Sequence, residues 1–228
     1  PFGDLLHLGV QRSSIRSIDN FKILARKILD SPNLNLVGVM GYEAQVAGLP
    51  DQNPFSPLLN WAKALIRKLS IKSVAKFRSE ISNWLKVENI EIEFFNGGGT
   101  GSLESTTKEL WITEVTAGSG FLQSHLFDYY SDSNFSSPAL IFALPISRFP
   151  SKDIATCKSG GFIASGEIGP DKAPIVYLPD GLKTISAEGY GEVQTPLKIS
   201  PELTLKPSDP IFFRPCMAGE IAEHFTNY

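Results

Sequence analysis

The sequence predicts a mixed α/β protein in which parallel strands and helices alternate up to about residue 130 and a β-rich region follows. Residues 34–40 form a nearly continuous apolar run, which is typical of a buried parallel strand. Two further strands, at 92–95 and 111–115, run directly into glycine clusters. From about residue 137 onward, short β-rich runs separated by proline and glycine indicate an antiparallel barrel or sandwich.

The first half contains three more expected elements. An apolar strand at 5–8 ends at Gly9. Ser17 can cap a helix whose apolar residues recur at a three-and-four spacing: Phe21, Leu24, Ala25, Ile28 and Leu29. A long amphipathic helix is expected at about 61–86. Four strands are too few to close a barrel of eight, so either the sheet is open or the missing strands precede Pro1.

The second half is expected to contain six β-rich runs and one helix. The runs are 139–144, 153–157, 160–164, 175–178, 191–194 and 211–213, and the helix is 218–225. The domains are therefore expected at 1–130 and 131–228. The chain starts at Pro1 rather than at a methionine and ends at Tyr228 without a helix stop signal, so we expect a fragment of a longer enzyme.

Composition excludes several classes of partner. The chain has 228 residues and a net charge of −3, and it lacks the basic block that nucleic-acid binding requires. Cys157 and Cys216 are the only cysteines, which is typical of a reducing compartment, and we expect a cytoplasmic protein. No apolar stretch approaches the roughly 20 residues of a spanning helix, so no membrane partner is expected.

The two glycine clusters predict a phosphate site. Asn96–Ser102 and Thr113–Gly120 each follow a strand and combine glycines with a Thr or Ser hydroxyl. Glycine lets the backbone lie close to a ligand, and successive N–H groups with a hydroxyl can hold a phosphate. Either motif alone could be a tight turn. Together, they indicate one phosphorylated small molecule held between two neighbouring strand ends.

Other polar residues have weaker functional interpretations. Arg12 follows a strand end and could bind a carboxylate or phenolate, although an exposed loop arginine would look the same. Tyr42 could stack on a planar ring or simply cover the core. Glu43 and Gln45 are expected to be polar loop residues rather than acid–base catalysts.

The histidines and cysteines give no strong metal signature. His7, His125 and His224 lack ligand spacing, and each is expected to be structural or exposed. Cys216 with His224 could bind zinc in principle, but their spacing is a poor signature. Arg214 and Glu220 flank the start of the last helix, where a carboxylate suits the helix dipole alone.

Together these segments resemble the family of D-threonine aldolase and D-serine dehydratase, in particular its amino acid deaminase/aldolase branch. The matching segments span almost the whole chain in a consistent order: 7–13, 37–45, 96–102, 113–120, 188–195 and 218–220. The resemblance implies an alanine racemase-like fold, in which a TIM-type (β/α) barrel that binds pyridoxal 5′-phosphate (PLP) precedes a β-domain. It also implies a small amino acid substrate, and we expect the full-length enzyme to be a homodimer.

The resemblance also implies roles for individual residues. Arg12 would approach the phenolic oxygen of PLP or the substrate carboxylate, and Tyr42 would cover the pyridine face. Thr116 lies near the position of the pyridine nitrogen, where the racemases carry an arginine. The residues expected to hold the phosphate are Gly98, Gly99, Thr100, Gly101, Gly118 and Ser119.

Two departures from the family pattern qualify these expectations. The Schiff-base lysine of the family lies on the first barrel strand, which would precede Pro1, and the lysines at 63, 68, 72 and 76 are expected on the solvated side of a helix. The metal-ligating segment reads 214–218 here and lacks the histidine, so dependence on a divalent metal is in doubt.

The expected function of the intact protein is that of a PLP-dependent lyase acting on small D- or β-hydroxy amino acids. Retro-aldol cleavage and dehydration with deamination both remain open. An amino acid racemase and a non-catalytic PLP-binding protein are the alternatives.

Overall fold

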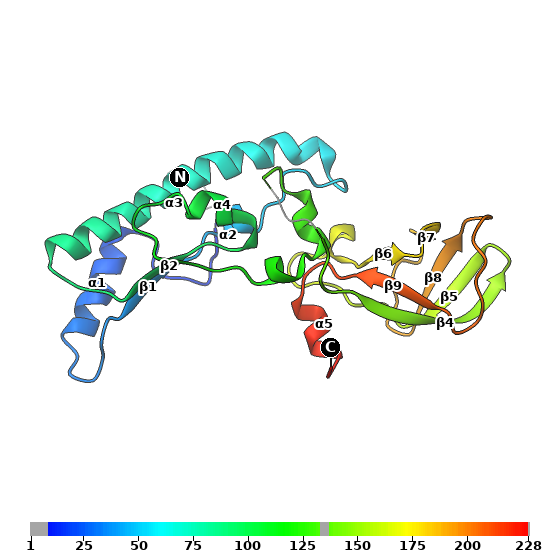
Figure 1. The fold of residues 1–228 in the computed structure, drawn as a ribbon. Helices are drawn as coiled ribbons and strands as arrows, with labels where there is room; N and C mark the ends of the chain where they lie inside the picture. Colours follow the sequence, from blue (N-terminus) through cyan, green and yellow to red (C-terminus); the bar gives the residue numbers. More distant parts are fainter. Residues whose placement is uncertain (1–8, 133–136, 228) are drawn as a thin grey trace. The chain divides into compact units, whose positions relative to one another are not determined.

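The computed structural model describes residues 9–132 and 137–227, so the strand expected at 5–8 and His7 lie outside the described residues. The chain forms two compact units (Figure 1). The first comprises Pro1–Gly118 and Tyr130–Asp132, and the second comprises Ser119–Tyr129 and Ser133–Tyr228. The chain therefore leaves the first unit at Gly118, returns to it for three residues, and leaves again.

The first unit contains a parallel three-stranded sheet in the order β1 (Gly38–Gly41), β2 (Phe94–Gly97) and β3 (Glu114–Val115). Met40 pairs with Asn96, and Asn96 pairs with Glu114. All three strands were predicted, but each begins later than its apolar run. Leu34 and Val37 are exposed, so the first part of the run at 34–40 is not a buried strand.

Two helices pack against this sheet. α1 (Ile18–Leu29) begins where predicted, and Ser17 Oγ accepts a hydrogen bond from the Asn20 N–H at 3.2 Å. Phe21 meets Trp84 edge-on, with ring centroids 5.8 Å apart. The core combines both helices with β1 and β2: Phe21, Ala25, Val39, Ile81, Trp84, Leu85 and Phe95. Leu24 and Leu29 of the predicted buried face are exposed instead.

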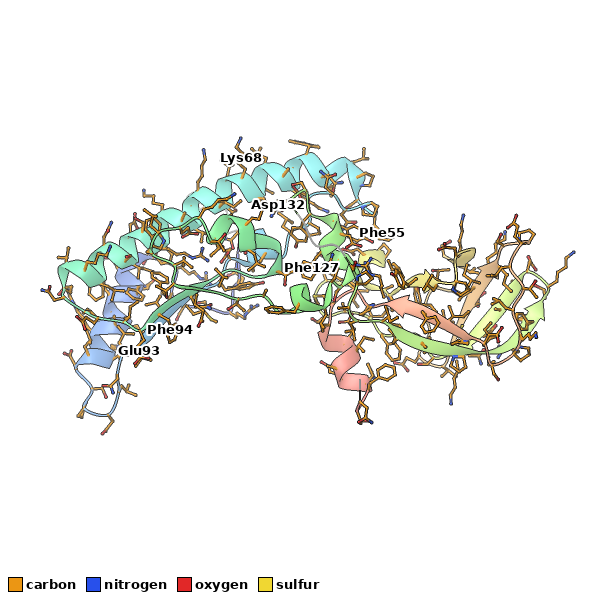
Figure 2. All side chains as sticks on the ribbon, in the orientation of Figure 1. Phe55, Lys68, Glu93, Phe94, Phe127 and Asp132 are labelled. Carbon is orange, nitrogen blue, oxygen red and sulfur yellow. The ribbon has the colours of Figure 1, made fainter. Side chains whose placement is uncertain are left out.

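The long helix α3 (Asn60–Val87) closely matches the prediction of 61–86. Its exposed side carries Lys68, Lys72 and Lys76, and Figure 2 shows Lys68 projecting away from the rest of the unit. Lys63 is half-buried and donates to Ser56 Oγ at 2.5 Å. The short elements of this unit are α2 (Ala44–Ala47), η2 (Pro57–Leu59), η3 (Thr100–Ser102) and α4 (Leu103–Thr106). No described helix is long and apolar enough to cross a membrane.

The second unit is a six-stranded antiparallel sheet in the order β6-β9-β4-β5-β8-β7. Its end strands β6 and β7 touch each other, which makes the sheet a nearly closed barrel. The strands are β4 (Phe142–Ser151), β5 (Ile154–Lys158), β6 (Ile175–Leu178), β7 (Leu182–Thr184), β8 (Gln194–Ile199) and β9 (Pro210–Arg214). The helical elements are η4 (Ser119–Leu122), η5 (His125–Tyr129), η6 (Pro170–Lys172) and α5 (Gly219–His224).

Three predictions for this unit were wrong in detail, the first being the run expected at 191–194, which overlaps β8 only at Gln194. Residues 160–164 are not a strand, because Gly160 has a φ of +131° and the Phe162 N–H turns back to the Gly160 carbonyl at 2.8 Å. The short strand β7 was missed. The apolar core of this unit is built around Leu144, Ile146, Leu197, Ile211 and Phe213.

Candidate functional site

The predicted site residues of the first unit lie at one edge of its sheet. Tyr42 follows β1, Gly98 follows β2 and Thr116 follows β3, and parallel strands end at the same edge. A Cβ at Gly98 would lie 3.6 Å from the Thr116 carbonyl oxygen, and one at Gly99 would lie 2.9 Å from Tyr42 Cε2. The two glycine motifs and the tyrosine are therefore neighbours within one unit.

Arg12 belongs to the same group. Burial raises the pKa of Tyr42, and the positive charge of Arg12 opposes that rise. Both side chains are exposed, Tyr42 at 46%. The structure thus brings together a cation, an aromatic ring and the Gly99 backbone.

The first glycine cluster is bonded within the protein. Gly98 has a φ of +90°, and its N–H donates to Glu43 Oε2 at 3.2 Å. The Gly99 N–H donates to Ser102 Oγ at 3.0 Å. A Cβ at Gly101 would lie 2.4 Å from Tyr130 Cε1, so this position needs glycine for packing. The N–H groups of Gly98 and Gly99 consequently have acceptors inside the protein.

The second glycine cluster is open. A Cβ at Gly118 would have no atom within 4 Å, and no described residue accepts a hydrogen bond from the Gly118 N–H. The hydroxyl of Ser119, the first residue of the second unit, accepts from the Ala218 N–H at 3.1 Å. An exposed N–H with no acceptor among the described residues is available to a ligand oxygen such as that of a phosphate.

Thr116 is held by a residue that the sequence reasoning missed. Asn96, buried near the end of β2, donates through Nδ2 to Thr116 Oγ1 at 2.8 Å and to Glu114 Oε1 at 2.6 Å. The amide therefore connects β2 to the segment that follows β3. The available signal was a polar residue at the end of an apolar strand.

Glu43, expected as a polar loop residue, precedes α2 and is buried. Its side chain is only 2% exposed, and Oε1 accepts from Ser102 Oγ and Thr106 Oγ1, each at 2.7 Å. Oε2 accepts from the Gly98 N–H and from Arg78 Nη2. A single carboxylate thus satisfies four donors around the first glycine cluster.

Arg78 of α3 joins the Glu43 network to two further segments. Nη2 also donates to the Gly41 carbonyl, and Nη1 donates to Glu109 Oε1 at 2.6 Å. The guanidinium therefore contacts the end of β1 and the segment that precedes β3. Sequence reasoning could have found it, because Arg78 interrupts the apolar stripe that it shares with Ile81 and Leu85.

A second buried arginine lies 11 residues earlier, about three turns away on the same face of α3. Arg67 Nη2 donates to the Gly101 carbonyl at 2.7 Å and to Asp132 Oδ1 at 3.0 Å. Its guanidinium also lies 5.1 Å from the centre of the Tyr130 ring. Arg67 therefore holds the far end of the glycine cluster and the returning segment Tyr130–Asp132.

The metal candidates of the second unit have other roles. Among the described residues, no group of three His, Cys, Asp or Glu side chains could hold a metal ion. Burial raises the pKa of the Cys216 thiol to about 12, and Sγ donates to the Asp171 carbonyl at 3.2 Å. His224 is exposed, and its ring lies 4.9 Å from that of Phe162.

The remaining polar candidates of this unit are structural. Arg214, the last residue of β9, binds both oxygens of Asp128, at 2.7 and 3.0 Å. Burial raises the pKa of Glu220, whose Oε1 accepts from the Met217 N–H at 2.8 Å. His125 is fully buried, with Nε2 2.8 Å from the Ala173 carbonyl oxygen. The Arg214–Asp128 pair therefore holds η5 to the end of β9, His125 holds η5 to the segment after η6, and Glu220 caps the start of its own helix.

Comparison with solved structures reveals three similar folds. D-threonine aldolase from Filomicrobium marinum superposes with a TM-score of 0.68 at 14% identity, over 93% of this chain and 54% of the aldolase. An alanine racemase-like protein from Idiomarina loihiensis gives 0.62 at 15%, over 93% and 56%. D-threo-3-hydroxyaspartate dehydratase from Delftia sp. HT23 gives 0.61 at 15%, over 95% and 59%.

No protein-family profile and no curated protein matches the chain. The chain spans a little over half the length of each of these structures. At this level of identity the agreement concerns the fold. The mixed α/β architecture predicted from the motifs is confirmed: the chain has part of the alanine racemase-like fold shared by D-threonine aldolase and D-threo-3-hydroxyaspartate dehydratase.

Proposed function

We propose that the protein is a PLP-dependent lyase acting on small D- or β-hydroxy amino acids, by retro-aldol cleavage or by dehydration and deamination. One observation supports the proposal: Tyr42 and both glycine clusters follow the ends of adjacent parallel strands, and the charge of Arg12 acts on the Tyr42 phenol. The sequence motifs supply the identity of the cofactor, because the family they resemble uses PLP. The folds of the aldolase and the dehydratase favour the lyase class.

When bound, PLP supplies an electron sink for the carbanion that forms at Cα. The phosphate is assigned to the open backbone at Gly118 and to the Thr100 hydroxyl, both in the first unit. Tyr42 covers one face of the ring, and its exposed position leaves room for a planar ligand. Arg12 provides a permanent cation for the phenolic oxygen or for the substrate carboxylate.

Thr116 is assigned to the pyridine nitrogen of the cofactor. Its hydroxyl is oriented by the buried amide of Asn96, and it is neutral. An arginine would place a positive charge beside the ring nitrogen and so disfavour its protonation, whereas the hydroxyl of Thr116 adds no charge. Thr116 therefore sets a different electron demand at the ring from that of an arginine. In this proposal the polarity at Thr116 selects among the carbanion reactions.

The test is a PLP titration of the full-length protein, followed by product analysis with D-threonine, D-threo-3-hydroxyaspartate and alanine. Glycine with acetaldehyde would identify an aldolase, and an oxoacid with ammonia would identify a dehydratase. Loss of optical activity in alanine would favour the racemase alternative, and tight PLP binding without turnover would indicate a PLP-binding protein. A wild-type protein that does not bind PLP would contradict the proposal.

A further inference from the structure

One carboxylate joins the residue that covers the ring to the loop assigned to the phosphate side of the site. Glu43 immediately follows Tyr42, and it bonds the Gly98 N–H and the hydroxyls of Ser102 and Thr106. These three donors lie near the start of the first glycine cluster, at its last residue and four residues beyond it. Glu43 therefore fixes the course of the loop relative to the end of β1.

The backbone at Gly98 depends on this contact. Its φ of +90° lies in the region that favours glycine, and the N–H is turned toward Glu43 Oε2. The Gly99 N–H then meets Ser102 Oγ, which itself donates to Glu43 Oε1. Two successive N–H groups are thus oriented by the same carboxylate, one directly and one through a hydroxyl.

The carboxylate is itself oriented. Arg78 binds Glu43 Oε2 and the Gly41 carbonyl, and both charged side chains are 2% exposed. Glu109 binds the other arm of the guanidinium. Buried charge-assisted hydrogen bonds of this kind are short and directional, so Glu43 has little freedom to leave the loop.

We propose that Glu43 is a positioning residue for the cofactor: it fixes the loop on both sides of Thr100, the residue of the first glycine cluster assigned to the PLP phosphate, and Arg78 orients it. This inference rests on the proposed function. Glu43 does not touch the cofactor, because its oxygens are directed to the loop and to Arg78. Its effect is therefore specific for the phosphate rather than for the pyridine ring.

The first unit contains a matched control. Asp51 is also a buried carboxylate paired with a buried arginine of α3, Arg67, at 3.5 Å. It accepts from the N–H and the hydroxyl of Ser131, at 3.0 and 2.7 Å. Asp51→Asn and Glu43→Gln make the same chemical change at similar burial. Glu43 bonds the residues on both sides of Thr100 directly, whereas Asp51 reaches the cluster only through Arg67, at the Gly101 carbonyl.

The experiment compares dissociation constants for PLP and for pyridoxal, which lacks the phosphate, in the full-length protein. We expect Glu43→Gln to weaken PLP binding more than tenfold and pyridoxal binding less than twofold. Asp51→Asn should leave PLP binding within twofold of the wild type. Equal weakening of PLP and pyridoxal by Glu43→Gln, or unchanged PLP affinity, would overturn the inference.

A milder variant decides the question if Glu43→Gln does not fold. Thr106→Val removes one donor to Glu43 while preserving side-chain shape, and we expect it to weaken PLP binding two- to fivefold with little change for pyridoxal. An unchanged ratio of the two affinities would overturn the inference. Failure of the wild type to bind PLP would instead overturn the proposed function, and this inference with it.

Discussion

A side chain added at Gly118 would meet no atom of the protein within 4 Å, so this position separates ligand binding from stability. We expect Gly118→Val to weaken PLP binding more than tenfold, because the β-branched side chain would occupy the space assigned to the phosphate. The melting temperature without cofactor should change little. Absorbance titration and thermal unfolding of the full-length protein measure the two effects.

Gly219→Val is the matched control, because a Cβ at Gly219 also has no neighbour within 4 Å and lies in the second unit. It should leave PLP affinity unchanged. Gly101→Ala should instead lower the stability of the protein, because its Cβ would lie 2.4 Å from Tyr130. Unchanged PLP affinity in Gly118→Val would remove Gly118 from the phosphate site.

His125 should make stability depend on pH. Burial lowers its pKa below the ordinary 6.5, and nearby Arg214 adds to this effect, while the bond to the Ala173 carbonyl and the charge of Asp128 oppose it. Below pH 6.5 the unfolded state therefore binds more protons than the folded state. The free energy of unfolding should fall as the pH drops from 7 toward the folded pKa, by at most about 1.4 kcal/mol per pH unit.

Denaturant unfolding of His125→Gln measures this contribution, because the Gln amide can still donate to the Ala173 carbonyl. Burial raises the pKa of Glu220 from 4.5, so its stabilising contribution is lost as the pH rises. This contribution is the same in wild type and variant, and it drops out of the difference between their stabilities. The stability difference between wild type and variant should change in favour of the variant between pH 7 and pH 5. A constant difference would show that His125 does not titrate differently on folding.

At the scale of elements, the helices were more predictable than the strands. The Ser17 cap and the length of α3 follow from local chemistry, namely a hydroxyl at the N-cap and an apolar spacing. The strand limits depend on partners distant in sequence. Leu34 is apolar but lies outside the ladder, and residues 160–164 turn at Gly160 instead of pairing.

The site was predictable to the extent that it follows from topology. Parallel strands end at one edge, so the convergence of Tyr42 with the two glycine clusters could be anticipated. The network of Glu43 and Arg78 could not, because the two residues are 35 positions apart and their pairing depends on the packing of α3. Only the interruption of an apolar stripe by Arg78 indicated a buried role.

The two buried arginines of α3 should matter more than any of its exposed charges. Arg78→Met leaves the carboxylates of Glu43 and Glu109 without their cation, and removing one partner of a buried ion pair costs about 3–5 kcal/mol. We expect a loss of this size in the free energy of unfolding measured with denaturant. Lys72→Met on the exposed side should change it by no more than about 0.5 kcal/mol.

The coupling between Glu43 and Arg78 can be measured by combining Glu43→Gln with Arg78→Met. If the cost of Arg78→Met arises from an unpaired buried carboxylate, then Glu43→Gln should cost less in the Arg78→Met background than in the wild type. Additive effects would show that the two side chains act independently.

At the scale of the whole molecule, chelation should have little effect. The Cys216 thiol is neutral at ordinary pH and hydrogen-bonded, and Arg214 occupies the position at the end of β9 with its charge paired to Asp128. We expect EDTA to leave the turnover of the PLP-loaded protein largely intact. Loss of activity in EDTA that zinc or manganese restores would show that a metal binds elsewhere.

The exposed face of the parallel sheet should make the 228-residue chain associate with itself. α1 and α3 cover the face that carries Val39 and Phe95, whereas Met40 on the opposite face is 70% exposed. Apolar surface of this kind at a sheet whose outer strands lack a further partner among the described residues favours pairing with another chain. Light scattering should therefore show oligomers that grow with concentration.

Substitutions can locate the associating surface. Met40→Lys places a charge on the uncovered sheet face and should shift the equilibrium toward the monomer. Leu58→Lys changes an equally exposed apolar residue, 86% accessible in η2, and should leave the oligomers unchanged. If only Leu58→Lys converts the oligomers to monomers, the associating surface lies at the start of α3. A monodisperse wild-type monomer would contradict association through either surface.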